Sequence, residues 1–164
     1  MRTPVLTIER LQYLIFVQRE SNLQAIYLSG GGEDMSPEHA KVLIAEDDPL
    51  IVKDMEFHLG EAGHDVVRKS ATLTEAQAMI SQIPALEKQY GAEKIIVVLG
   101  GNLGEWKMPE DRHNDSQVLL RLLKEQRLDH IRTVGFSGNS VPGTTVDVGK
   151  NAGGKALADA VTAL

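Results

Sequence analysis

The sequence contains no cysteine, which excludes disulfides and thiolate metal sites and fits a reducing compartment. It has no apolar run near the ~20 residues that a membrane-spanning helix needs, and residues 11–17 are too interrupted for a signal peptide. Acidic residues outnumber basic ones, 23 to 17, and the net charge of −6 argues against nonspecific nucleic-acid binding. We therefore expect a cytoplasmic protein that contacts neither a membrane nor nucleic acid.

The 164 residues have an ordinary composition, 42% hydrophobic and 24% charged, which predicts one domain with a sizeable core. Residues 1–34 differ from the rest. Apolar positions between Ile8 and Ile15 are spaced for a short amphipathic helix, and residues 29–34 are typical of a flexible linker. Two interpretations stay open for residues 1–34, namely a docking helix or a disordered extension. The domain itself is expected over residues 35–164.

Short apolar runs alternate with segments of helical periodicity along that domain. Strands are expected over five runs: Lys41–Ala45, Asp65–Lys69, Ile95–Leu99, Ile131–Phe136 and Thr144–Val148. Helices are expected from Pro49 to Leu59, from a Thr74 cap to a break at Pro84, from Ala85 to Tyr90, after a cap at Asn114 or Asp115, and from Ala152 to Leu164. This alternation predicts an α/β domain, a parallel sheet with helices on both faces.

The first strand ends in three acids and a proline, residues 46–49. The carboxyl ends of strands are where open parallel sheets build their sites, and Asp48 is placed to cap a helix that begins at Pro49. The strand, the acidic turn and the helix together resemble the receiver domain of bacterial two-component response regulators. In that family two adjacent acids at this point hold a magnesium ion, and Glu46 and Asp47 match them. With right-handed crossovers, the resemblance implies a flavodoxin-like (CheY-like) sheet of order 2-1-3-4-5.

The resemblance also implies that the phosphorylation site is altered. In receivers the third strand ends in the aspartate that accepts a phosphoryl group, but Gly100 stands there, and glycine cannot form an acyl phosphate. Ser137 and Lys150 match the hydroxyl residue and the lysine that contact the phosphoryl group. Asp147 replaces the aromatic residue that reports activation in the family. Each residue also has a plain structural interpretation, Ser137 as a turn residue and Lys150 as a solvated lysine.

For magnesium the resemblance leaves only Glu46, Asp47 and the backbone carbonyl of Asn102. Because one carboxylate ligand is gone, we expect weak or vestigial magnesium binding and no other cofactor. Lys150 is expected to pair directly with Asp47 or Glu46. On this assignment, the substitution Gly100→Asp should restore a nucleophile and allow inefficient phosphorylation by acetyl phosphate.

The segment between Ser137 and Lys150 is too short to hold both a helix and the fifth strand comfortably. It contains Pro142 and is bounded by glycines, so the fourth helix of the family is expected to be reduced or missing. Apolar side chains of the last three strands would then need another cover, either a partner, a second copy of the chain or the helix near Ile8.

These observations favour a stand-alone pseudo-receiver that acts by protein–protein interaction and is not an enzyme. The expected partners are a histidine kinase, another receiver or an output protein, with homodimerisation possible. A second interpretation keeps phosphorylation, with Asp47, Asp48 or Ser137 as the acceptor. A third is a small phosphate-ester or nucleotide-binding enzyme, although the sequence has no P-loop and no dinucleotide fingerprint.

Overall fold

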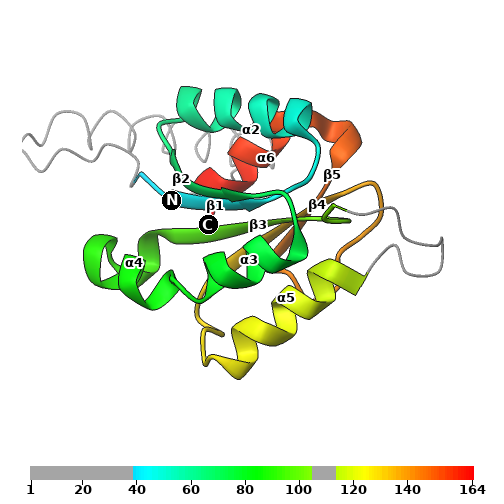
Figure 1. Cartoon of the computed structure of the whole chain (residues 1–164). Helices are drawn as coiled ribbons and strands as arrows, with labels where there is room; N and C mark the ends of the chain where they lie inside the picture. Colours follow the sequence, from blue (N-terminus) through cyan, green and yellow to red (C-terminus); the bar gives the residue numbers. More distant parts are fainter. Residues whose placement is uncertain (1–38, 105–113) are drawn as a thin grey trace, which may run out of the picture. The chain divides into compact units, whose positions relative to one another are not determined.

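The computed structural model describes residues 39–104 and 114–164, which are built around a five-stranded parallel sheet (Figure 1). Its strands pair in the order β2-β1-β3-β4-β5, which confirms the predicted flavodoxin-like fold. The elements are β1 Lys41–Ala45, α2 Pro49–Glu61, β2 Asp65–Ser70, α3 Leu73–Ile80, α4 Ile83–Tyr90, η1 Ala92–Lys94, β3 Ile95–Gly100, α5 Asn114–Glu125, β4 Arg132–Ser137, β5 Val146–Gly149, η3 Lys150–Ala152 and α6 Gly153–Thr162. The helix and linker expected within residues 1–34 lie outside the described residues.

Helices cover both faces of the sheet and make three layers (Figure 1). On one face α2 and α6 pack over Val42, Ile44 and Val98, and on the other α3, α4 and α5 pack over Leu43 and Val97. Adjacent residues of β1 and β3 thus point into different cores, which is why these strands are apolar throughout. In the described part of the chain, no helix is long and apolar enough to cross a membrane.

Two helix starts show how local chemistry sets the boundaries. Asp48 caps α2 as predicted, since its carboxylate accepts hydrogen bonds from the backbone of Leu50 and Ile51. The predicted Thr74 cap is wrong. Thr72 caps α3 instead, because its hydroxyl and the Glu75 carboxylate each accept a hydrogen bond from the other residue's backbone N–H.

The predicted interruption near Pro84 is confirmed, but the boundary differs. The chain leaves α3 after Ile80, and Ile83 opens α4 rather than ending α3. Proline lacks a backbone N–H and is tolerated in the first turn of a helix, where that group has no helical partner. Pro84 accordingly lies in the first turn of α4.

No helix forms in residues 138–145, which join β4 to β5, so the predicted loss of the fourth helix is confirmed. On the sheet face left without that helix, β4 presents Thr133, Gly135 and Ser137, because the residues alternating with them point into the core under α2 and α6. The expectation of an apolar face in need of a cover is therefore wrong for this part of the sheet.

Polar side chains hold the β4–β5 connection against that face. Thr133 and Thr145 each donate a backbone N–H to the other's hydroxyl, at 3.0 and 3.1 Å respectively. The Asp147 carboxylate lies over Gly135 and accepts a hydrogen bond from the backbone N–H of Val141 at 3.1 Å. A side chain at Gly135 would displace it, and Val141, only 5% exposed, closes the core at this point.

His64, in the turn between α2 and β2, links three segments of the chain. Its Nδ1 accepts a hydrogen bond from the Ala40 N–H at 3.2 Å, and its Nε2 lies 2.9 Å from the Thr162 hydroxyl. Because that hydroxyl donates to the Ala158 carbonyl, Nε2 carries the proton and the ring is neutral. Burial, assisted by the neighbouring His39, lowers the pKa of His64.

This arrangement predicts that the protein loses stability in mild acid. Since the folded pKa of His64 lies below its ordinary 6.5, the unfolded chain binds more protons between the two values, although Asp65 partly opposes the shift. The free energy of unfolding should therefore fall as the pH drops below about 6.5 toward the folded pKa. Urea unfolding across this range tests it.

The substitution His64→Gln should flatten this pH dependence. The matched variant His130→Gln removes an exposed histidine that pairs with Glu87 at 2.5 Å, and it should leave the contribution of His64 in place. An equal slope in His64→Gln and the parent would contradict the assignment.

Candidate functional site

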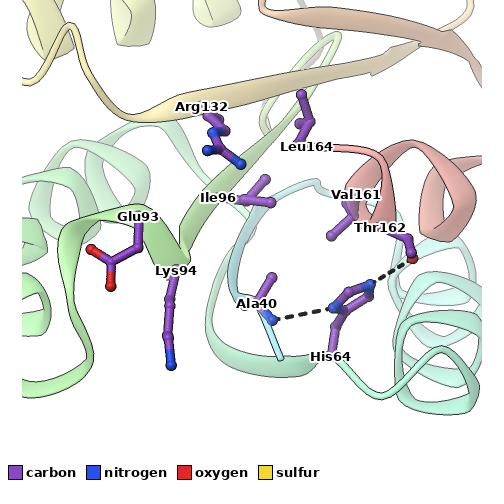
Figure 2. A pocket seen from close by; sticks show the side chains of 9 residues that line it. All are labelled: Ala40, His64, Glu93, Lys94, Ile96, Arg132, Val161, Thr162 and Leu164. Atoms are coloured by element: carbon purple, nitrogen blue, oxygen red, sulfur yellow. Dashed lines mark hydrogen bonds between the residues drawn. The ribbon is translucent and has the colours of Figure 1, made fainter. Parts of the chain in front are cut away.

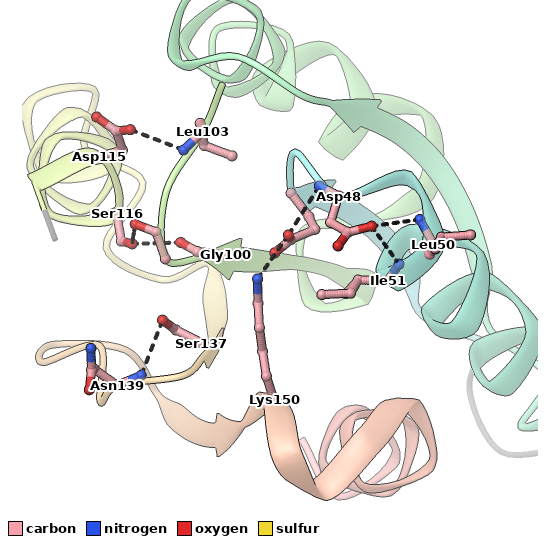
Figure 3. A network of polar contacts seen from close by, with 12 residues as sticks. Asp48, Leu50, Ile51, Gly100, Leu103, Asp115, Ser116, Ser137, Asn139 and Lys150 are labelled. Atoms are coloured by element: carbon pink, nitrogen blue, oxygen red, sulfur yellow. Dashed lines mark hydrogen bonds and ion pairs between the residues drawn. The ribbon is translucent and has the colours of Figure 1, made fainter. Parts of the chain in front are cut away.

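Glu46 and Lys150 form an ion pair at the carboxyl edge of the sheet. Glu46 directly follows β1 and is 2% exposed, and its backbone N–H donates to the Ser70 carbonyl of β2 at 3.0 Å, which extends the sheet by one residue. Lys150 follows β5 and reaches toward the end of β1 (Figure 3), where its Nζ lies 2.8 Å from Glu46 Oε1. Lys150 was predicted to pair with either Asp47 or Glu46. That prediction is confirmed, and the partner is Glu46.

The two oxygens of the Glu46 carboxylate have different surroundings. Oε1 accepts from Lys150 and from the backbone N–H of Asp48 at 3.2 Å, whereas Oε2 has no hydrogen-bond partner within the described residues. Burial raises the pKa of Glu46, and the hydrogen bond and charge of Lys150 act in the opposite direction. The lysine therefore compensates part of the desolvation of a carboxylate held inside the protein.

Gly100 ends β3 beneath Glu46. A Cβ atom at this position would clash with Glu46 Oε2 and would lie 2.8 Å from the Ala45 carbonyl oxygen. Gly100 does not adopt a left-handed backbone, so its conformation alone does not require glycine. Packing requires it instead, because the Glu46 carboxylate fills the space that a side chain at the end of β3 would occupy.

Ser137 lies beside the next glycine. It is 6% exposed, and its hydroxyl stands where a Cβ of Gly101 would be. That hydroxyl also accepts a hydrogen bond from the Asn139 N–H at 3.4 Å, shown in Figure 3. The close approach of β3 and β4 at their carboxyl ends thus depends on two consecutive glycines.

Two residues at the start of α5 that were not predicted as part of the site fix the path of the chain after β3. Ser116 donates a hydrogen bond to the Gly100 carbonyl at 2.7 Å, and Asp115 accepts one from the Leu103 N–H at 3.0 Å (Figure 3). Both side chains are 2% exposed. The sequence predicted Asp115 only as a possible helix cap. Its contact with Leu103 could have been inferred only from its burial, which the sequence does not reveal.

A cavity of about 260 Å³ brings most of the predicted site together. It is lined by Asp47, Gly101, Asn102, Ser137, Gly138, Asn139 and Lys150. Glu46 lies outside this cavity, buried under Lys150, and Asp48 is committed to the cap of α2. Among the described residues, the cavity therefore offers one carboxylate, one hydroxyl and one ammonium group that is already paired.

These groups do not fit a resident magnesium site. Within residues 39–104 and 114–164, no three histidine, aspartate or glutamate side chains are placed to hold a metal ion. Of the three predicted magnesium ligands, Asp47 and Asn102 line the cavity. The third, Glu46, lies outside it and is paired with Lys150. Magnesium prefers several oxygen ligands in an octahedral shell, and the nearby lysine opposes a cation.

Comparison with known proteins shows which fold this is. No protein-family model and no curated protein matches the chain. Solved structures do: the signal receiver domain of NarL from Mycobacterium tuberculosis (16% identity, 76% of this chain and 94% of that one, TM-score 0.56) and a response regulator receiver protein from Sinorhizobium medicae (22% identity, 78% and 95%, TM-score 0.52). A CheY-like receiver domain protein from Methanospirillum hungatei is similar over 76% of this chain at 16% identity, with a TM-score of 0.53. At these identities the likeness establishes a receiver fold.

We predict that magnesium binds weakly, with a Kd on the order of many millimolar, because Asp47 is the one carboxylate that the described residues contribute to the cavity. Titration followed by amide NMR should show small shifts near Asp47 and Asn102. Asp47→Asn should remove them, whereas Glu61→Gln, which neutralises an exposed acid at the end of α2, should not. Saturable submillimolar binding would contradict this prediction.

The packing of Gly100 revises the expectation that Gly100→Asp restores phosphorylation. The new side chain meets the Ala45 carbonyl and places a second carboxylate against Glu46, so we expect a loss of about 2 to 3 kcal/mol in the free energy of unfolding. Urea unfolding measures it. The matched variant Gly149→Ala adds a Cβ in open space and should change stability by less than about 0.5 kcal/mol.

A double variant tests whether the Glu46 carboxylate causes the loss of stability in Gly100→Asp. If Glu46 fills the space above Gly100, Glu46→Ala combined with Gly100→Asp should cost less than the sum of the two single changes. Strict additivity would place the conflict at the Ala45 carbonyl alone.

Proposed function

We propose that this protein is a pseudo-receiver, a module of two-component signalling that acts through protein–protein contacts without phosphorylation at Gly100. The receiver fold supports the signalling role. Its partners would be a histidine kinase, another receiver, an output protein or a second copy of the chain, met in the cytoplasm. Among the described residues the large exposed hydrophobic side chains are Leu50 and Phe57, which stand two turns apart on α2 and would suit such a contact.

One observation carries the proposal, the Glu46 carboxylate packed on Gly100 and paired with Lys150 at 2.8 Å. The place where a nucleophile would stand at the end of β3 is filled by an acid from the end of β1. The lysine that would meet a phosphoryl group already has an anionic partner. Phosphorylation there would need both a new side chain and a broken ion pair.

The second candidate function is a receiver that is phosphorylated at a residue other than the one at position 100. Of the three residues considered, Asp48 is engaged as the α2 cap and Ser137 is 6% exposed. Asp47 is exposed and lines the cavity with Ser137 and Lys150, so the geometry favours it among these alternatives. Hydrolysis of a phosphate ester would use the same cavity, but its described lining has no histidine and no second carboxylate to act beside Asp47.

Intact mass after incubation with acetyl phosphate and magnesium tests the proposal. We expect no added phosphoryl group and no turnover of p-nitrophenyl phosphate, and a receiver of known activity serves as the positive control. A stoichiometric increment that disappears in Asp47→Asn would replace the proposal with the second candidate. Turnover of the ester would replace it with the enzyme.

A further inference from the structure

A second cavity lies at the amino ends of the strands, at the edge of the sheet opposite Glu46 and Lys150 (Figure 2). Its volume is about 290 Å³. Ile96 of β3 and Val161 of α6, each 2% exposed, give it an apolar wall, and Leu164 extends that wall. Because pockets for drug-sized molecules begin near ~300 Å³, this one suits a small ligand.

Two cations line this cavity without a counter-ion. Arg132, the first residue of β4, and Lys94, the last of η1, are half-buried, and the side chain of neither has an ion pair or hydrogen bond in the described ranges. In Figure 2 the guanidinium of Arg132 points from β4 toward Ile96, while Lys94 extends away from it at the rim. A half-buried guanidinium has lost part of its hydration, and no acceptor in the described part of the chain replaces it.

No other lining residue of the described ranges forms an ion pair with either cation, and this includes the terminal carboxylate of Leu164. Glu93 carries the one side-chain carboxylate that lines the cavity; it is exposed, and Figure 2 shows it directed away from Arg132. His64 uses both ring nitrogens, one with the Ala40 N–H and one with Thr162, and stays neutral. The cavity therefore combines two cations that have no ion-pair partner in the described residues with an apolar wall.

We propose that this cavity binds a small organic acid, a carboxylate with a short apolar body. The planar fork of Arg132 can donate to both carboxylate oxygens at once, and Lys94 adds charge from the rim. The body would pack on Ile96 and Val161. Inorganic phosphate matches less well, because the apolar wall supplies no donors for its further oxygens. The site lies on the opposite edge from the proposed signalling site and does not depend on that proposal.

Amide NMR of the full chain, titrated with sodium butyrate at constant ionic strength, tests the site. Saturable shifts are expected at Ile96, Arg132 and Thr162 but not at Ser137 or Lys150. Butyramide has the same size and no charge, and it should bind at least about tenfold more weakly. Inorganic phosphate should also bind more weakly than butyrate.

Charge-removing variants show whether the arginine carries the binding. Arg132→Gln should weaken butyrate at least about fivefold. The matched variant Arg121→Gln removes an exposed arginine of α5, 3.8 Å from Glu125, and should leave the affinity unchanged. If the amide spectrum shows that Arg132→Gln does not fold, Lys94→Gln is tested instead. It should weaken butyrate binding about twofold, and Lys124→Gln is its control.

Four results would each overturn the proposal. They are no saturable shifts with butyrate, equal binding of butyramide, tighter binding of inorganic phosphate, and a folded Arg132→Gln or Lys94→Gln variant with the affinity of the parent. A further result would also overturn the proposal. Shifts centred on Ser137 and Lys150 would place the anion at the carboxyl edge of the sheet instead.

Discussion

The buried carboxylate of Glu46 is the constraint around which the carboxyl edge of the sheet is arranged. A charged oxygen at 2% exposure is tolerated only with close compensation, which Lys150 and the Asp48 N–H provide at one of its two oxygens. The pairing connects the end of β1 to the end of β5, two strands that β3 and β4 separate in the sheet. Because the other oxygen rests on Gly100, the same carboxylate also dictates the residue that ends β3.

Contacts between residues that are distant in the sequence also explain why the domain needs no helix between β4 and β5. The uncovered part of the sheet is polar, and the connection lies down on it through the Asp147 contact with Val141. Gly135 leaves room for that carboxylate. Asp147 therefore anchors the β4–β5 connection to the sheet.

Charged side chains are paired differently at the two edges of the sheet. At the carboxyl edge Lys150, which lines the cavity there, is paired with the buried Glu46 carboxylate. At the amino edge Arg132 and Lys94 line a cavity with no partner within the described residues. The paired lysine at one edge and the two unpaired cations at the other thus give the two ends of the same parallel sheet different electrostatic surroundings.

The sequence by itself determined the strands, the sheet class and the edge at which Asp47, Ser137 and Lys150 meet. Buried parallel strands are continuous apolar runs, a local property, and the ends of parallel strands necessarily share an edge. It also indicated the missing helix, because chain length limits a crossover. Tertiary structure alone decided that Lys150 pairs with Glu46, that Gly100 is required by packing, and that the uncovered face is polar. Each of these depends on a distance of a few ångströms between strands that are far apart in the chain, and no local pattern encodes such a distance.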